Sequence, residues 1–327
     1  MSAEGATKAV VAALTANIFI AITKFAAWAL TGASSMLAEA IHSVADSGNQ
    51  VLLLVGGRRA QREATPEHPF GYGRERYVFA FIVSVVLFSV GGLFALYEAY
   101  HKYHEVHAHE PNLLLEGPWW WVPLVVLSAA IIAESFSFRT AIIESNKVRG
   151  KQGWSKFIRS AKAPELPVIL LEDFAALLGL IFALFGVGMT LLTQNGYFDV
   201  IGTAMIGLLL VAVACALAIE TKSLLVGEAA SSESVARIEH AITTTEGVDR
   251  MIHMKTMHLG PEEVLVVAKI GVSGSATAAE VAETIDRAEV SIRAAEPTVT
   301  ALFLEPDIYN PQHVPAQRPE RPSAPSH

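Results

Sequence analysis

Residues 34–57 read SSMLAEAIHSVADSGNQVLLLVGG, and this stretch decides the fold. As a helix it is long enough to cross a hydrocarbon core of about 30 Å, yet it contains Glu39, His42, Asp46 and Asn49. Their offsets of three, four and three residues place all four on one helical face. Ionisable residues inside a membrane span are costly and mark functional sites by default. The stretch therefore predicts a membrane helix with a functional polar stripe.

The whole chain has the composition of a membrane protein. Over its 327 residues the mean hydropathy is +0.40, and 17% of the residues are charged, against roughly 25% in an average soluble domain. A large soluble α/β enzyme rich in Ala, Val and Leu is the alternative, but such a protein rarely repeats apolar stretches of about 20 residues. We predict six membrane spans, at residues 8–30, 34–57, 77–100, 119–141, 166–192 and 198–220.

The distribution of Lys and Arg predicts the orientation of these spans. The side opposite the termini has few basic residues: 31–33 and 193–197 have none, and the loop after the third span has only Lys102. The loops after the second and fourth spans are rich in them, with Arg58, Arg59, Arg62, Arg74, Arg76, Lys147, Arg149, Lys151, Lys156, Arg159 and Lys162. We therefore expect a multi-pass protein of a bacterial plasma membrane with both termini in the cytoplasm.

Two further global features limit the function. The formal net charge is −8, but no acidic or basic run is long enough to indicate a nucleic-acid surface. The single cysteine, Cys215, lies inside an apolar run, so a disulfide framework is excluded.

The character of the chain changes after Glu220. Its alternation predicts, in order, a helix, two strands, a helix and a strand, at residues 232–245, 248–258, 264–272, 276–294 and 298–304. This order suits a small α+β sandwich. Residues 310–327 are rich in Pro, Arg and Ser and are expected to form a disordered tail. We divide the chain into a membrane domain at 1–225, a cytoplasmic domain at 226–309 and the tail.

The pairing of His42 with Asp46 indicates a cation site. One helical turn brings an imidazole nitrogen and a carboxylate oxygen toward a single ion, and zinc accepts this mixture in tetrahedral geometry. Because His titrates near neutral pH, it exchanges a proton for a metal ion, which suits an antiporter. The alternative is a polar stripe that holds two helices together by hydrogen bonds. An imidazole and a carboxylate near the middle of the membrane favour the cation site.

The fifth span contains the other paired acids, Glu172 and Asp173, in VILLEDFAALLGL. Adjacent residues point about 100° apart on a helix, so the two do not face one ion equally. Asp173 is the preferred third ligand. Glu172 is a fourth ligand, a proton carrier or the partner of a cytoplasmic base.

Two other groups of polar residues have open interpretations. Lys24 in the first span lies at a depth similar to that of Glu39, so a structural ion pair and a transport role are equally open. The segment HKYHEVHAHE, residues 101–110, resembles a metal-collecting tract. A solvated extension of the third span is at least as good an interpretation of it.

Five segments in order carry a family resemblance: SSMLAEAIHSVADSGNQ (34–50), HPFGYGRERY (68–77), LLEDFAALLG (170–179), YFDVIGTAMIG (197–207) and MHLGPEEVLV (257–266). The chain resembles the cation diffusion facilitator family, and within it the branch of the animal mitochondrial zinc transporter 9. The resemblance implies a homodimer of six-helix membrane protomers, each with a C-terminal cytoplasmic α+β ferredoxin-like domain. It also implies efflux of a divalent cation in exchange for protons by alternating access.

The family's zinc site takes a four-spaced pair from each of the second and fifth spans. His42 and Asp46 match the first pair, and Asp173 matches the second member of the second pair. The first member corresponds to Ile169, which is a departure from the family. The fourth position is then open to water, Glu172 or Asn49. Such a site binds zinc less tightly or prefers manganese, iron or cobalt, since geometry and softness set selectivity.

The sequence thus predicts a proton-coupled exporter of a divalent metal cation, with zinc favoured, and with no cofactor and no enzymatic activity. The predicted metal ligands are His42, Asp46, Asp173, Glu172 and Asn49. The expected partners are the cation, protons, the lipid bilayer and a second copy of the chain. A metal-sensing or scaffold protein that has lost transport is the alternative, because Ile169 replaces a ligand. A membrane enzyme using Glu172 and Asp173 has no accompanying nucleophile or phosphate loop to support it.

Overall fold

The computed structural model describes residues 3–311. The chain forms two compact units, residues 1–226 and 227–327, and each is described by itself. The predicted disordered tail falls almost wholly on residues 312–327, which lie outside the described residues. The assignment of the units to efflux and regulation, with a division at residue 225, stays a prediction.

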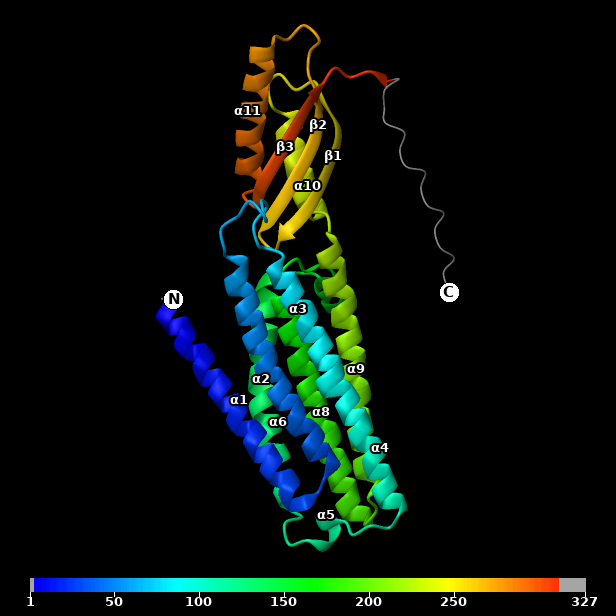
Figure 1. Ribbon diagram of the computed structural model, residues 1–327. Coiled ribbons are helices and arrows are strands. Elements are labelled where there is room, and N and C mark those ends of the chain that lie inside the picture. The colour runs from blue at the N-terminus through cyan, green and yellow to red at the C-terminus, as the bar shows by residue number, and fades with distance from the viewer. Residues whose placement is uncertain (1–2, 312–327) are drawn as a thin grey trace. The chain divides into compact units, whose positions relative to one another are not determined.

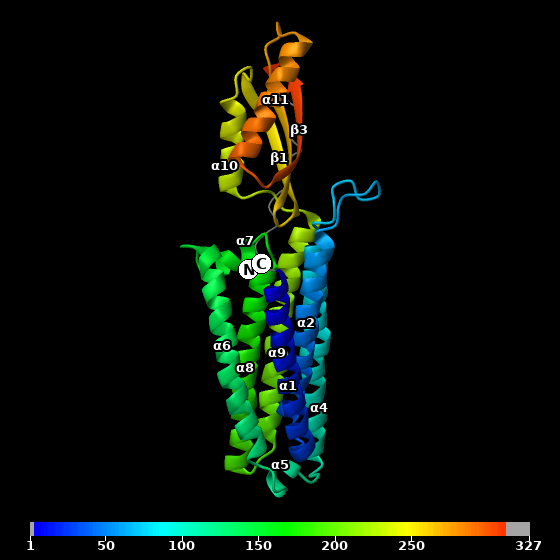
Figure 2. The ribbon, with the colours of Figure 1, turned by 90° about the vertical axis from the view of Figure 1, so that its left-hand side faces the viewer.

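Unit 1 is a bundle of long helices (Figures 1 and 2). Helix α3 (Glu75–Val86) continues through a π-helical segment, η1 (Leu87–Leu93), into α4 (Phe94–His107). In chain order the elements are α1 (Ala3–Thr31), α2 (Ser34–Ala60), α3 (Glu75–Val86), η1 (Leu87–Leu93), α4 (Phe94–His107), α5 (Leu113–Glu116), α6 (Val122–Arg149), α7 (Trp154–Ser160), α8 (Glu165–Thr193) and α9 (Tyr197–Val226).

Within the described residues, four helices are long and apolar enough to cross a membrane: Glu75–His107, Val122–Arg149, Glu165–Thr193 and Tyr197–Val226. They coincide with the third to sixth predicted spans. The first two predicted spans also form helices, but α1 contributes a shorter apolar stretch, Asn17–Thr31. Helix α2 is 27 residues long, and its polar stripe and terminal arginines keep it out of this set. The count of six spans therefore stays a prediction.

The core of unit 1 lies where α2, α8 and α9 meet the α3–η1–α4 helix. Its fully buried side chains include Met36, Leu87, Leu180 and Ile206. Helices α8 and α9 cross closely at two glycines, since a Cβ on Gly202 would lie 2.8 Å from the Phe182 carbonyl oxygen. Small residues at a crossing let two backbones approach, which is a main source of stability between membrane helices.

The π-helical segment η1, LFSVGGL, interrupts an otherwise α-helical span. Such segments are rare and often occur at functional sites. Its Gly91 faces the imidazole of α2, where a Cβ would lie 3.9 Å from His42 Nδ1. The irregular turn of this span therefore lies beside the polar stripe.

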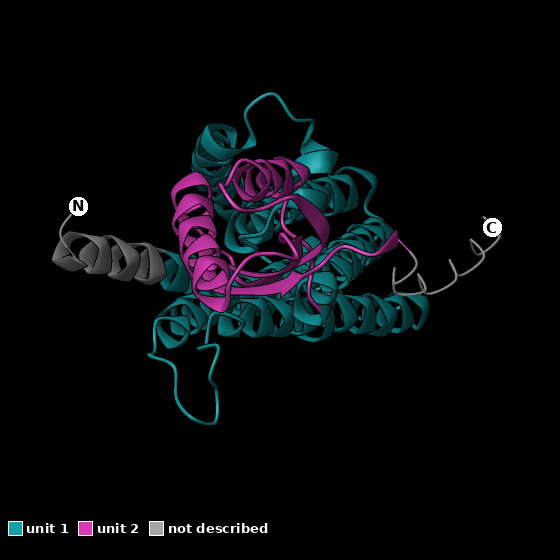
Figure 3. Ribbon diagram, turned by 90° about the horizontal axis from the view of Figure 1, so that it is seen from above, with its two compact units in different colours: residues 1–226 teal, residues 227–327 magenta. Residues whose placement is uncertain are grey.

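Unit 2 is a three-stranded sheet with two helices on one face, coloured magenta in Figure 3. Its elements are α10 (Ser232–Thr243), β1 (Arg250–Gly260), β2 (Glu263–Gly271), α11 (Ala278–Ala295) and β3 (Val299–Asp307). The strand order is β1-β2-β3; β1 and β2 are antiparallel, and β2 and β3 are parallel. Because parallel strands need a crossover connection, α11 lies between β2 and β3 in the chain.

The predicted order of elements in unit 2 is confirmed, and the ends of the elements differ from the predicted ones by at most three residues. The core between helices and sheet contains Ile238, Ile242, Ile270 and Ile292. Helix α11 begins with a capping box, in which Thr277 and Glu280 satisfy each other's backbone amides.

Candidate metal-ion site

Helix α2 places His42 and Asp46 one turn apart on its inner face. The distance between His42 Nε2 and Asp46 Oδ2 is 3.4 Å, and the two side chains are 1% and 20% exposed. The i,i+4 spacing of the sequence is therefore realised as a close imidazole–carboxylate pair inside the bundle.

Several polar atoms of this face have no hydrogen-bond partner among the described residues. They are Glu39 Oε1, His42 Nδ1 and Nε2, Asp46 Oδ1 and Asn49 Oδ1, and all five atoms are buried. Leaving a buried polar atom unsatisfied costs about 1–3 kcal/mol, so each such atom calls for an explanation. These are nitrogen and oxygen donors of the kind that zinc accepts, and their chemistry fits a cation substrate.

Helix α8 packs against α2 and presents its two acids to different neighbours. Glu172 Oε1 accepts a hydrogen bond of 2.7 Å from Asn49 Nδ2, which joins α8 to α2. Asp173 Oδ2 accepts one of 2.9 Å from Ser137 Oγ on α6. As the sequence predicts for adjacent residues of a helix, Glu172 and Asp173 point toward different neighbouring helices.

The five predicted ligands do not all converge. In the part of the chain that the structure describes, no three His, Cys, Asp or Glu side chains lie close enough to hold a metal ion. His42 and Asp46 form a pair, and Asn49 and Glu172 form another. Asp173 instead bonds to Ser137, and Ile169 is 36% exposed on the same helix. The ligand set stays a prediction.

A buried ion pair lies one turn before His42 on the same helix. Lys24 Nζ of α1 is 3.0 Å from Glu39 Oε2 and donates a 2.7 Å hydrogen bond to Ser43 Oγ. The sequence leaves open whether Lys24 has a transport role or forms an ion pair with Glu39, and the structure contains the ion pair.

Asp199, in the first turn of α9, is a site residue that the sequence does not single out. Its carboxylate accepts hydrogen bonds from the backbone N–H of Ser34, at 2.8 Å, and of Ser35, at 3.3 Å. The residue before α2, Ala33, provides no side-chain cap. Asp199 therefore caps α2 from another helix, where a negative charge is stabilised. A lone Asp at the start of an apolar span was the available signal.

Ser137 is likewise not predictable as a partner of Asp173, because serines in membrane helices commonly bond to their own backbone. Its neighbour Ser135 does so, donating to the Ile131 carbonyl.

The histidine tract continues α4 as a solvated helix. His101 pairs with Glu105 at 3.3 Å and is 58% exposed. The rings of Tyr100 and Tyr103 pack against His104 and His107. These contacts agree with the interpretation of the tract as an extension of the third span.

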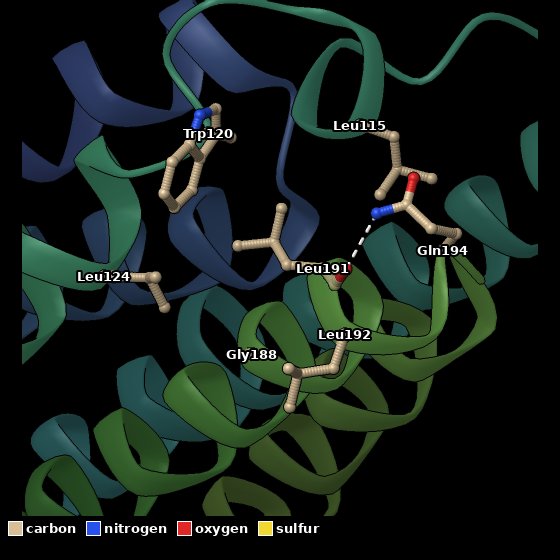
Figure 4. Close-up of a pocket in the computed structure, with 7 residues that line it drawn as sticks. All are labelled: Leu115, Trp120, Leu124, Gly188, Leu191, Leu192 and Gln194. Atoms are coloured by element: carbon tan, nitrogen blue, oxygen red, sulfur yellow. Dashed lines mark hydrogen bonds between the residues drawn. The ribbon is translucent and has the colours of Figure 1, made fainter.

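A pocket of about 580 Å³ lies at the end of α8 farthest from Asp173 (Figure 4). Its wall includes Trp120, Leu124 and Leu191, and Gln194 donates a 2.8 Å hydrogen bond to the Leu191 carbonyl. None of the lining residues that the structure describes is ionisable. The pocket is therefore not a candidate for the cation site.

A bundle of membrane-length helices with intramembrane acids and an imidazole, followed by a small α/β unit, defines an integral membrane protein of the ion-transporting class. A family model described as the cation efflux transmembrane domain matches residues 10–226. The chain belongs to the cation efflux family, as its resemblance to the cation diffusion facilitators predicted.

Curated relatives match most of the chain. It is 30% identical to the proton-coupled zinc antiporter SLC30A9, mitochondrial, of Homo sapiens, over 83% of this chain and 47% of that protein. It is 28% identical to metal tolerance protein C4 of Arabidopsis thaliana, over 82% of this chain and 57% of that protein. The chain thus spans about half the length of the first of these relatives.

Among solved structures, unit 2 is similar to a nickel form of the MamM CTD. The sequence identity is 18%, the TM-score is 0.24, and the match covers 24% of this chain and all of that one. A TM-score of this size supports no argument about function.

Proposed function

We propose that this protein exports a divalent transition-metal cation, with zinc favoured, from the cytoplasm in exchange for protons. The observation that carries the proposal is the buried pair of His42 and Asp46 on α2, whose ring nitrogens and Oδ1 have no hydrogen-bond partner among the described residues. The family membership of residues 10–226 supports the same function.

The chemistry of the pair supports proton coupling. A metal ion binds neutral imidazole and ionised carboxylate, so binding releases protons and proton uptake releases the metal. The same two groups therefore serve both substrates in turn, which is the requirement for an exchanger. The two similar proteins named above are a zinc antiporter and a metal tolerance protein.

The identity of the ion depends on the second helix. Asp173 is the proposed third ligand from α8, and the position one turn before it is the apolar Ile169. Glu172 and Asn49, which bond to each other at 2.7 Å, are the proposed sources of a fourth oxygen. A site richer in oxygen than in nitrogen admits manganese, iron or cobalt alongside zinc.

The topology and assembly are part of the proposal. Basic residues at the end of α2 and in the segment between α6 and α8 support cytoplasmic termini by the positive-inside rule. We propose six spans, alternating access, a bacterial plasma membrane and a homodimer with unit 2 as its cytoplasmic domain.

Flux through reconstituted protein tests the proposal. Liposomes loaded with a zinc-sensitive dye receive a pH gradient, and wild type is compared with His42→Ala and Asp46→Ala. We expect flux from wild type and at least about a hundredfold less from either variant. Asp286→Ala, a substitution on the exposed face of α11, is the control and retains wild-type flux. Equal flux from wild type and Asp46→Ala contradicts the proposal.

A metal sensor without transport is the second candidate, favoured by Ile169. It predicts that wild type binds zinc with a dependence on Asp46, yet shows no more flux than protein-free liposomes. Parallel assays with Mn²⁺, Co²⁺ and Fe²⁺ identify the ion in either case.

A further inference from the structure

Helix α1 contributes a buried cation, Lys24, to the interior of unit 1. Lys24 is 3% exposed, and its ammonium lies between two groups of α2, the carboxylate of Glu39 and the hydroxyl of Ser43. Lysine is rarely buried unless it is paired, and a charge within a membrane span marks function by default. The pair is therefore more than a packing detail between α1 and α2.

Glu39 and Ser43 flank His42 on the helix, so Lys24 is held directly beside the candidate ion site. Glu39 is fully buried and lies three residues before His42, on the same face. Only one of its oxygens is used by Lys24. The other, Oε1, has no hydrogen-bond partner among the described residues.

Helix α8 leaves room for that second oxygen. A Cβ added to Gly179 would lie 2.5 Å from Glu39 Oε1, so any larger residue would displace the carboxylate. Glu39 therefore extends across the bundle to the helix that carries Asp173. Without Lys24, this face would present an additional carboxylate donor one turn from His42.

We propose that Lys24 sets the affinity of the ion site by neutralising Glu39 and withholding it from the transported cation. The inference rests on the proposed function. A free carboxylate beside His42 would hold a divalent ion too tightly to release it, whereas the paired carboxylate adds no net charge. Lys24 and Glu39 thus act on affinity through their charges and are not themselves ligands.

The test compares the directions in which three variants change the affinity for zinc. Removing the ammonium with Lys24→Met, which keeps the length of the side chain, tightens zinc binding by about tenfold or more and slows turnover. Removing the carboxylate charge with Glu39→Gln leaves the ammonium unpaired and weakens binding by about tenfold or more. The double variant Lys24→Met/Glu39→Gln has no net change in charge and returns to within about threefold of wild type.

Two controls isolate the charge of Lys24. Lys24→Arg keeps the charge and retains wild-type affinity. Lys102→Met removes another buried lysine, which bonds the Gly32 carbonyl and Glu105 away from His42, and leaves affinity unchanged. Each binding curve is measured on the full chain and compared with that of the same variant carrying Asp46→Ala. Only zinc binding that is lost with Asp46 is then attributed to the ion site.

The outcomes separate this inference from the proposed function. If Lys24→Met weakens binding as Glu39→Gln does, the pair is structural and the inference is overturned. If the double variant stays as weak as Glu39→Gln, Glu39 is itself a ligand, and the inference again fails. Should Lys24→Met not fold, the double variant and Lys24→Arg still decide. Failure of the proposed function is recognised separately, by the absence of Asp46-dependent flux in wild type.

Discussion

At the scale of residues, the polar stripe of α2 divides into groups with different tasks. His42 and Asp46 keep donor atoms unpartnered among the described residues, Asn49 is committed in part to Glu172, and Glu39 to Lys24. The residues of this one helical face therefore make three different kinds of contact. Glu39 forms an ion pair, His42 and Asp46 form the candidate ligand pair, and Asn49 connects α2 to α8.

Restoring a donor at the apolar position of α8 should raise the affinity for zinc. Ile169→His places an imidazole one turn before Asp173, where the family has a ligand. We expect zinc to bind about tenfold more tightly, and its preference over Mn²⁺ to increase, because imidazole suits zinc better than manganese. Competition between the two ions in a binding titration measures this. Ile181→His, on an exposed part of the same helix, is the control. Equal gains from both variants would contradict the prediction.

The sequence was sufficient to predict the close pair of His42 and Asp46, because their spacing within one helix determines it. It was not sufficient for contacts between helices. The bond from Asn49 to Glu172 and that from Ser137 to Asp173 depend on the rotation of α2, α6 and α8 about their axes. Apolar spans have little periodicity to define that rotation, so the partners of Asp173 were not predictable.

At the scale of elements, the start of α2 depends on a residue distant in sequence. Asp199 accepts bonds from the amides of Ser34 and Ser35, and Ser34 Oγ in turn donates to Glu98 at 3.0 Å. Three helices are therefore joined at one end of the bundle. Caps are predictable from sequence when they are local, as at Thr277 of α11, and not when another helix supplies them.

Removing this cap should destabilise unit 1. Asp199→Ala leaves two buried amides without acceptors and should lower the free energy of unfolding by about 1–3 kcal/mol. Denaturant titration of the protein in detergent, with helical content as the signal, measures the change. Thr203→Ala is the matched control, since that hydroxyl bonds only within its own helix, to the Asp199 carbonyl. A loss in the control as large as in Asp199→Ala would show that the cap contributes nothing specific.

The capping box of α11 should make the start of that helix sensitive to acid. The backbone hydrogen bond from Thr277 lowers the pKa of Glu280 below its ordinary value of 4.5. A lowered pKa in the folded state stabilises the helix above the unfolded pKa, and the benefit is lost as the pH falls through the folded value. Hydrogen exchange of the first α11 amides should therefore be faster in Glu280→Gln than in wild type at pH 7. The difference should shrink as the pH falls through the lowered pKa of Glu280, and a difference independent of pH would contradict this origin.

At the scale of the whole molecule, both units were predictable in outline. The order of five elements in unit 2 and the positions of the long helices of unit 1 follow from periodicity and apolar length. The interruption by η1 was not predictable, because LFSVGGL is as apolar as the α-helical turns around it. The number of spans is harder to predict, since α2 combines membrane length with a polar face.

Accessibility labelling tests the proposed topology of the whole chain. Cys215→Ser first removes the single native thiol. Glu67→Cys, in the loop after α2, should then react with an impermeant thiol reagent only after the cells are opened, because that loop is predicted to be cytoplasmic. Asn195→Cys, between α8 and α9, should react in intact cells. The reverse pattern would invert the orientation of the protein, and reaction of both sites in intact cells would contradict an odd number of membrane-crossing helices between them.

The close crossing of α8 and α9 has a mechanical consequence. A Cβ added to Gly202 would lie 2.8 Å from the Phe182 carbonyl oxygen and 3.1 Å from the Gly186 Cα, so α8 and α9 form a helical hairpin that is packed backbone to backbone. One arm of this hairpin carries Asp173 and the other carries Asp199, which holds the first turn of α2. We therefore expect a tilt of this hairpin to displace Asp173 and the first turn of α2 together.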